Sequence, residues 1–257
     1  TRVTVDKRLS FDEVQEHVDG QTPADWTEEV RTTVDDLVEL HRVLRNRRSE
    51  QEGFLSLETP AARIVCEGDP MRVTGIQLRQ YRTADAVVEE FMLKANETVA
   101  GELVEREIPG LFRVHPEPRR PDIENFRNWA KDYLGFKVGH LENRHEINRF
   151  LREVAEEPTR DVVTTSFLSV LSRAKYSAKL QPHFGLGKEQ YSHFTSPIRR
   201  YPDLLVHQQL WQYDHDLPSR TVSECGHVAR DCSDKEANVD EADFAVQDRL
   251  KLRYIRT

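Results

Sequence analysis

The sequence predicts an α+β fold that is mostly helical and contains a small number of strands. Apolar residues recur every three or four positions over most of the 257 residues, which is the spacing of helices with one buried face. Short apolar runs bounded by glycine or proline are few, so strands are expected to be rare. Neither an internal repeat nor a low-complexity linker divides the chain. We therefore expect one core without a domain boundary.

Two helices and a hairpin are expected in the first third of the chain. Ser10 and Glu13 form a capping box, which predicts a short helix that runs to Val18 and ends at Asp19-Gly20. A longer helix is predicted over residues 27–48 by its apolar spacing. The last feature is a predicted hairpin, whose strands are residues 62–66 and 71–77 and whose turn is residues 67–70.

The rest of the chain is predicted to be helical with one further strand. Residues 83–104 form a strong helical pattern, and LFRVH at residues 111–115 is typical of a short buried strand. Pro116 and Pro118 end that strand. Further helices are predicted at residues 122–133, 142–154, 161–172, 202–213 and 222–254.

The stretch HFTSPIRRYPDLLVH, residues 193–207, contains the features of a helix start. Thr195 or Ser196 can cap the helix, and Pro197 fits the first helical position, where no N–H is needed. The free N–H groups of such a start attract anions. A second proline, Pro202, would remove a backbone bond from a helix begun there, so a start near Tyr201 is the alternative.

The same stretch combines charge with an apolar face. Arg199 and Arg200 can each grip two phosphate oxygens with the planar guanidinium. On spacing alone, a surface helix with solvated arginines is as reasonable as a phosphate site. The apolar face is expected to be buried, and it is formed by Ile198, Tyr201, Leu204 and Leu205.

Composition limits the class of protein. The chain is 37% hydrophobic and 32% charged, with a net charge of −8, which argues against non-specific nucleic-acid binding by the whole surface but not against a local basic channel. No apolar run is long enough to span a bilayer, and the start of the sequence lacks the apolar segment of a signal peptide. We expect a cytoplasmic protein with no membrane partner.

The cysteines and histidines indicate neither disulfides nor a zinc site. Cys66, Cys225 and Cys232 have no CxxC spacing, and an odd, low count is typical of reduced thiols. Cys66 lies in an apolar run, which predicts a core position. The ten histidines include no HExxH pair.

The longer stretch HFGLGKEQYSHFTSPIRRYPDLLVH, which begins at His183, closely resembles the signature of the ribonuclease II / ribonuclease R (RNB) family. The resemblance runs nearly end to end, because VVEEFMLKANETVA and LFRVHPEP are similar to a helix and a strand of that family. It implies an RNB-type catalytic domain, a 3′-to-5′ exoribonuclease that hydrolyses single-stranded RNA processively to nucleoside monophosphates with Mg²⁺. Single-stranded RNA is then the expected partner, with other RNA-decay proteins as further candidates.

The resemblance also implies roles for individual residues. Arg199 matches the family arginine at the scissile phosphate and is the catalytic candidate, where it would stabilise developing charge. Glu89 matches a glutamate near the terminal sugars, and a carboxylate can accept from a 2′-OH. Spacing alone favours an exposed helix carboxylate at that position. The other RNA-binding candidates are Phe11, His193, Thr195, Ser196, Arg200 and Tyr201.

Two departures from the family pattern concern aromatic residues. An aromatic hydroxyl of the bacterial pattern is replaced here by Phe11, so the ring is kept and its hydrogen bond is lost. A phenylalanine that clamps the stacked bases corresponds to Leu57 or Ser56. This replacement weakens a stack that contributes about 1–3 kcal/mol per base. Phe54 could supply a ring instead.

The closely spaced aspartates that hold the family's magnesium have no counterpart in the sequence. Asp35-Asp36 and Asp240/Asp243 are dense acidic pairs, but both lie in predicted helices and are interpreted as surface charge. Two-metal phosphodiester chemistry needs such carboxylates. We therefore predict no metal ligand here. Residues 1–257 are interpreted as the C-terminal portion of an RNB domain, without its aspartate-bearing part and without an S1 module.

Three functions remain in competition at the level of sequence. The first is an active exoribonuclease domain whose aspartates lie elsewhere. The second is a catalytically inactive RNB-fold protein that binds RNA, which Phe11 and Leu57 favour somewhat. The third is an acidic helical interaction domain with an accidental signature, which the length of the match disfavours.

Overall fold

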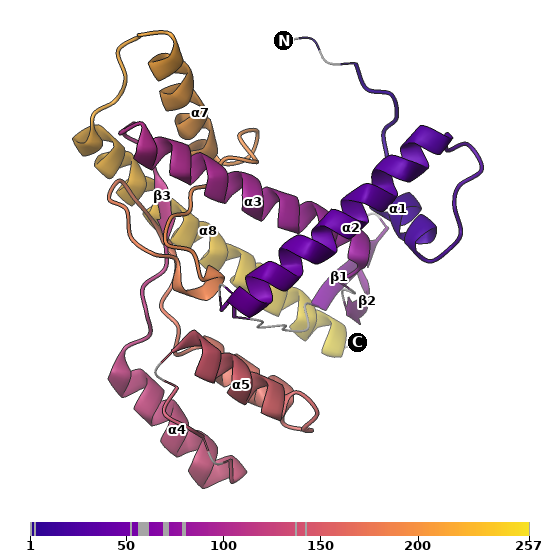
Figure 1. Cartoon of the computed structure of the whole chain (residues 1–257). Coiled ribbons are helices and arrows are strands. Elements are labelled where there is room, and N and C mark those ends of the chain that lie inside the picture. The colour runs from indigo at the N-terminus through magenta and orange to yellow at the C-terminus, as the bar shows by residue number, and fades with distance from the viewer. Residues whose placement is uncertain are drawn as a thin grey trace. The chain divides into compact units, whose positions relative to one another are not determined.

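The described residues group into two compact units. A computed structural model describes residues 2, 4–51, 53–55, 62–68, 72–78, 81–136, 138–141 and 143–256, and Figure 1 shows the course of the chain. Unit 1 comprises Thr1–Glu52 and Gln80–Ala95, and unit 2 comprises Gly53–Arg79 and Asn96–Thr257. The sequence has no linker between them because helix α3 (Thr83–Glu105) continues from one unit into the other. The expectation of one undivided core was therefore wrong.

Unit 1 is built from α1 (Phe11–Val18), α2 (Glu28–Gln51) and the first part of α3. The capping box is confirmed: Glu13 N–H donates to Ser10 Oγ at 3.2 Å, and Ser10 N–H donates to the Glu13 carboxylate at 2.7 Å. A buried ion pair joins α2 to α3, with Arg48 Nη2 2.9 Å from Glu90 Oε2. The apolar core of the unit consists of Trp26, Val34, Val38 and Val87.

Unit 2 contains two small antiparallel sheets. Strands β1 (Ala62–Glu67) and β2 (Arg72–Leu78) form the predicted hairpin, with a register shift between Val65 and Cys66. Strand β3 (Phe112–Val114) pairs with β4 (Lys175–Ser177), which the sequence did not predict. Cys66 is only partly buried, so the core position expected for it was wrong. All three cysteines are free, as predicted.

The helices of unit 2 form around two apolar clusters. Its remaining elements are α4 (Arg120–Leu134), α5 (Arg144–Val154), α6 (Arg160–Leu168), the 3₁₀ turn η1 (Phe184–Leu186), α7 (Tyr201–Asp214) and α8 (Val222–Ile255). One cluster joins α4, α5 and α6 through Phe126, Phe150 and Phe167. The other packs α3, β3, α7 and α8 together and includes Leu205 and the fully buried Cys225.

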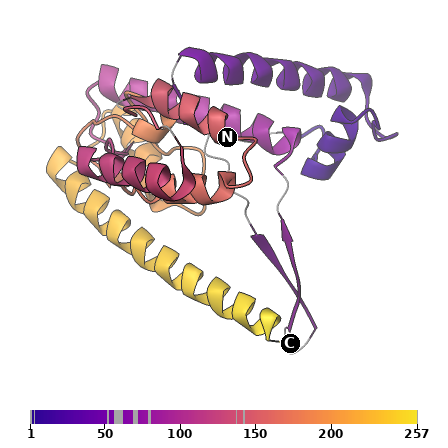
Figure 2. The same cartoon turned by 90° about the horizontal axis from the view of Figure 1, so that it is seen from below.

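Helix α8 is the longest element and is unevenly covered. Its first half contributes the buried Cys225 and Ala229 to the core. Its second half runs beside the β1–β2 hairpin (Figure 2) and exposes Phe244 and Ile255. No described helix is both long and apolar enough to cross a membrane.

The predicted and observed elements agree in type more closely than in length. The mostly helical α+β class with few strands is confirmed. Helix α6 ends at Leu168 instead of residue 172, and α4 begins two residues earlier than predicted, at Arg120. Ser56 and Leu57, the positions considered for a base-clamping ring, lie outside the described residues.

Candidate nucleic-acid interface

Residues 194–200, here called the signature turn, precede helix α7. The N–H groups of Arg199 and Arg200 both donate to the Ser196 carbonyl, at 3.3 and 3.0 Å. Helix α7 begins at Tyr201, and its N-cap is Arg200, whose side chain makes no capping bond. A helix begun at Ser196 would place Pro202 in its second turn and lose a backbone bond, whereas Pro202 fits the first turn of α7. The later of the two predicted starts is therefore the observed one, and neither hydroxyl residue caps the helix.

Asp203 stabilises this turn from inside the protein. Its side chain is fully buried, and Oδ1 accepts from Ser196 N–H at 2.8 Å and from Arg200 Nη2 at 2.7 Å. The charge of Arg200 is therefore neutralised by a buried partner. Sequence reasoning missed Asp203, although an acid three residues after an arginine at a helix start could have indicated the pair.

Asn96 holds the other end of the turn. It lies on α3, is 3% exposed, and its Oδ1 accepts from the N–H groups of Phe194 at 2.9 Å and Thr195 at 3.2 Å. Its Nδ2 donates to the Tyr191 hydroxyl at 3.0 Å. On the opposite side, His207 donates from Nε2 to the Phe194 carbonyl at 2.9 Å, and their rings stack 3.9 Å apart. No spacing in the sequence indicated Asn96.

The side chains at the tip of the turn face solvent. Ile198 is 101% exposed, and Arg199 is exposed with no hydrogen-bond or ion-pair partner among the described residues. The predicted burial of an apolar face was wrong, since Tyr201 and Leu204 are also exposed and only Leu205 is buried. Helical spacing does not apply at Ile198, because the chain there forms a turn.

His193 is partly buried and belongs to a row of ring side chains next to the turn. Its Nδ1 shares a hydrogen bond of 2.9 Å with the Tyr176 hydroxyl, and its ring contacts that of Tyr191 edge-on at 5.9 Å between centroids. Burial, reinforced by the nearby Arg200, lowers the pKa of His193 to about 2. The next ring along the row is His183, where burial and then His115 lower the pKa to about 3. Both imidazoles are therefore neutral at physiological pH.

The predicted site residues fall into two groups. The structure brings together His193, Thr195, Ser196, Arg199, Arg200 and Tyr201 in one segment of unit 2. Glu89 and Phe11 belong to unit 1. Glu89 is exposed and accepts from the Tyr81 hydroxyl at 2.5 Å, and burial together with this bond raises the pKa of Tyr81. Phe11 is the first residue of α1 and is 48% exposed.

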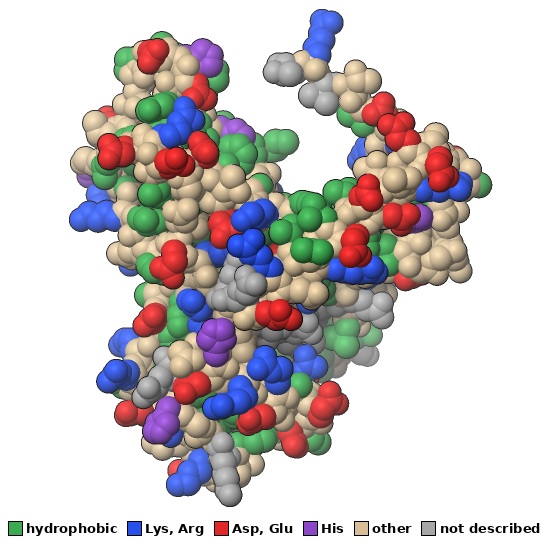
Figure 3. Space-filling view, in the orientation of Figure 1, with side chains coloured by type: hydrophobic (Ala, Val, Ile, Leu, Met, Phe, Trp, Pro, Cys, Tyr) green, Lys and Arg blue, Asp and Glu red, His purple; other side chains and the backbone are tan. Residues whose placement is uncertain are grey.

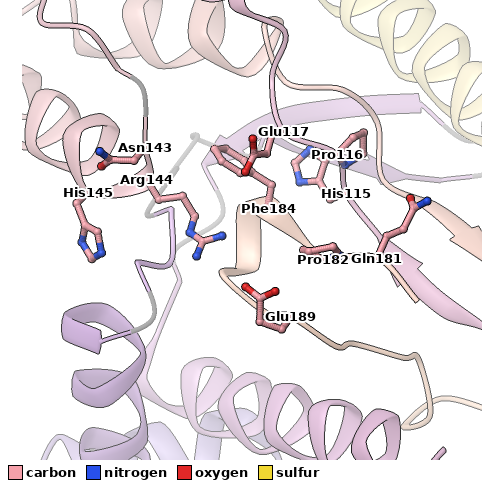
Figure 4. Close-up of a pocket in the computed structure, with 10 residues that line it drawn as sticks. All are labelled: His115, Pro116, Glu117, Asn143, Arg144, His145, Gln181, Pro182, Phe184 and Glu189. Carbon is pink, nitrogen blue, oxygen red and sulfur yellow. The ribbon is translucent and has the colours of Figure 1, made fainter. Parts of the chain in front are cut away.

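A cavity of about 500 Å³ opens at the start of α5 (Figure 4). Arg144 and His145 line one side, with the Arg144 guanidinium 5.8 Å from the centroid of the Phe184 ring. Glu117 and Glu189 line the other side. Its charges are therefore of both signs, which does not select for an anion.

Surface charge is mixed, and no metal site is evident. On the face shown in Figure 3, basic and acidic side chains are interspersed. Among the described residues no group of three or more histidine, cysteine, aspartate or glutamate side chains could hold a metal ion. The described part of the chain therefore offers no ligand set that fits Mg²⁺.

Comparison with known proteins decides the family. The model of the RNB domain matches residues 1–216. The chain belongs to the RNB domain family. It is 31% identical to ribonuclease R of Thermotoga maritima over 97% of this chain and 36% of that protein. It is 29% identical to ribonuclease R of Escherichia coli over 96% of this chain and 32% of that protein. The chain thus spans about a third of the length of these RNB relatives.

Solved structures confirm the fold. Ribonuclease R of Mycoplasma genitalium in complex with ribose-methylated single-stranded RNA superposes with a TM-score of 0.88 at 24% identity, over 95% of this chain and 39% of that one. Yeast Ssd1, described as a pseudonuclease, superposes with a TM-score of 0.64 at 20% identity, over 87% and 27%. At these identities the likeness establishes the mostly helical RNB fold and not the activity.

Proposed function

We propose that residues 1–257 are the C-terminal portion of an RNB domain that acts as a 3′-to-5′ exoribonuclease on single-stranded RNA. The observation that carries this proposal is the exposed Arg199, whose side chain has no partner among the described residues, on a turn whose Thr195, Ser196 and Arg200 are held by hydrogen bonds. The family and the ribonuclease R relatives support it. The products are nucleoside monophosphates released processively.

Arg199 performs the central task of this chain in the proposed reaction. Its free guanidinium contacts the non-bridging oxygens of the scissile phosphate through two parallel hydrogen bonds. Because charge on these oxygens grows as the bond breaks, the interaction strengthens toward the transition state. Arg200 is already paired with Asp203, so its contribution is to the shape of the turn and to the local positive potential.

The other candidates distinguish and hold the RNA. The exposed Glu89 carboxylate accepts from a ribose 2′-OH, which selects RNA over DNA. The exposed rings of Phe11 and Tyr201 offer faces on which bases or sugars can pack. Thr195 and Ser196 line the approach to Arg199, and the neutral His193 supports the turn from behind.

The metal ion, the cellular location and the protein partners are proposed from the family. Membership of the RNB family suggests that the reaction depends on a divalent metal ion. We propose that this ion is Mg²⁺ and that residues outside the described part of this chain hold it. We also propose a cytoplasmic location and association with other RNA-decay proteins.

A second candidate function is RNA binding without hydrolysis. Phe11 stands where the family has an aromatic hydroxyl, and the fold of Ssd1 shows that a pseudonuclease shares this architecture. Arg199 would contact a phosphate under either function, so the two functions differ only in whether the RNA is cut.

The test is a time course with 5′-labelled single-stranded RNA, the full-length protein and Mg²⁺, resolved on a denaturing gel beside a DNA of the same sequence. Shortening of the RNA from its 3′ end, with the DNA intact, is the expected result. RNA that stays intact while a gel shift shows binding would establish the non-catalytic alternative.

A further inference from the structure

Three consecutive backbone N–H groups at the root of the signature turn are held by side chains from outside it. Asn96 Oδ1 accepts from Phe194 and Thr195, and Asp203 Oδ1 accepts from Ser196. Both acceptors are buried, Asn96 at 3% and Asp203 at 0% exposure. Because buried hydrogen bonds to fixed acceptors lose little to water, they restrict the backbone here more than a surface loop is restricted.

The restraint passes directly to Arg199. Ser196, whose N–H is fixed by Asp203, supplies the carbonyl that accepts from the Arg199 and Arg200 N–H groups. The Arg199 side chain has no partner of its own among the described residues. The backbone at Arg199 therefore sets where this side chain starts and in which direction it leaves the turn, and that backbone is restrained through the two acceptors.

We propose that Asn96 and Asp203 are positioning residues that fix the signature turn so that Arg199 meets the scissile phosphate. This inference rests on the proposed function for its effect on cleavage. Asn96 is the more informative of the two, because it lies on α3, far from the turn in sequence, and its side-chain hydrogen bonds within the described chain go to Tyr191, Phe194 and Thr195 and to neither arginine.

The geometry of Asn96 suggests a matched pair of substitutions. Asn96→Ala removes the acceptor for both N–H groups. Asn96→Asp keeps a carbonyl-like oxygen at the same place, and its second oxygen can bond to the Tyr191 hydroxyl that Nδ2 now contacts. A positioning role predicts that the aspartate restores what the alanine removes.

Gln209 provides a control for simple loss of stability. It is also a fully buried amide, and it bonds the Pro109 carbonyl and both backbone groups of Arg220, away from the signature turn. Gln209→Ala removes a comparable set of buried hydrogen bonds. It is expected to lower the melting temperature as Asn96→Ala does and to leave the cleavage rate per folded molecule unchanged.

The experiment measures single-turnover cleavage of single-stranded RNA, RNA affinity by gel shift, and amide hydrogen exchange of peptides covering residues 191–200, in the full-length protein. Asn96→Ala is expected to slow cleavage about 10- to 100-fold while the Kd changes less than about threefold, with Asn96→Asp within about threefold of wild type. Exchange at residues 194–196 should accelerate in Asn96→Ala and not in Gln209→Ala.

A double substitution shows whether Asn96 acts through Arg199. If it does, Arg199→Ala with Asn96→Ala cleaves no more slowly than Arg199→Ala alone, because the group being positioned is already gone. Multiplied losses, or unchanged exchange in Asn96→Ala, would overturn the proposal. If the wild-type protein does not cleave RNA, the proposed function is wrong. Hydrogen exchange still tests whether Asn96 restrains the backbone of the turn, because that measurement does not depend on cleavage. If Asn96→Ala does not fold, Asn96→Ser replaces it, because the serine side chain is too short for its hydroxyl to reach the N–H groups of Phe194 and Thr195.

Discussion

The signature turn and the cavity at the start of α5 both contain arginine, but only the turn has an arginine without an acidic side chain paired with it or facing it among the described residues. In the turn, Asp203 neutralises Arg200 from inside the core, and Arg199 keeps its full charge. In the cavity, Glu117 and Glu189 stand opposite Arg144 and His145. A phosphate is attracted by net local charge and not by the presence of arginine. The contrast therefore favours the turn over the cavity as the proposed phosphate site.

Arg199→Ala should have the largest effect on function. Loss of a single preorganised donor to developing charge costs about 100- to 1,000-fold in turnover. RNA affinity should change much less, because many other contacts hold the strand. Single-turnover cleavage and gel-shift titration measure the two effects. Equal losses in both would reduce Arg199 to a plain binding contact.

Asp203→Ala should have the largest effect on stability. Asp203 is fully buried and Arg200 is 20% exposed, so the charge left on Arg200 is partly solvated and the loss should be about 2–3 kcal/mol, below the range for a fully buried pair. Asp240 is the matched control, because its pair with Arg173 is exposed, with side chains 45% and 49% accessible. Asp240→Ala should cost less than about 1 kcal/mol. Urea unfolding of both variants measures the two changes in the free energy of unfolding. Similar changes would show that the pair at Asp203 stabilises the protein no more than an exposed pair does.

The buried histidines should make the turn sensitive to acid. The pKa of His183 is lowered to about 3 and that of His193 to about 2, from an ordinary value of 6.5. Between pH 6.5 and 3 the unfolded chain therefore binds more protons than the folded one, and stability falls as the pH falls through this window. The melting temperature measured from pH 8 to pH 4.5 should decline below about pH 6.5. His193→Gln should flatten the decline, and an unchanged slope would exclude His193 as its source.

Arg144→Ala should have the smallest effect. Since acidic side chains already oppose Arg144 in the cavity, RNA affinity should change less than about twofold, and the slope of log Kd against log salt should stay the same. Gel-shift titrations at several salt concentrations make this measurement. A tenfold loss with a shallower slope would place the cavity on the path of the RNA.

Local sequence patterns predicted the elements well wherever one short rule was sufficient. The capping box at Ser10, the β1–β2 hairpin and the start of α7 near Tyr201 each follow from a few neighbouring residues. Strand β4 was missed because three residues carry too little periodicity, and its pairing with β3 depends on residues about sixty positions away. The buried face predicted at Ile198 failed because a turn was treated as a helix.

The candidate site divides in the same way between local and distant information. Arg199 was identified by its immediate neighbours and by resemblance, and the structure adds that it alone of the arginine pair is unopposed. Asn96 could not have been found from its surroundings in the sequence. Its importance arises from two hydrogen bonds to residues 98 and 99 positions away, which only the folded chain reveals.

The burial of Cys225 provides a probe of how often the fold opens. Cys225 lies on α8 and is fully buried in the apolar cluster that this helix forms with α3, β3 and α7, and burial raises the pKa of its thiol, so both access and thiolate formation are suppressed in the folded protein. Cys66 and Cys232 are only partly buried and remain accessible to reagents. Alkylation of Cys225 therefore requires this cluster to open. The rate of its modification, compared with the rates of the other two cysteines, reports how often the packing of α8 against this cluster opens.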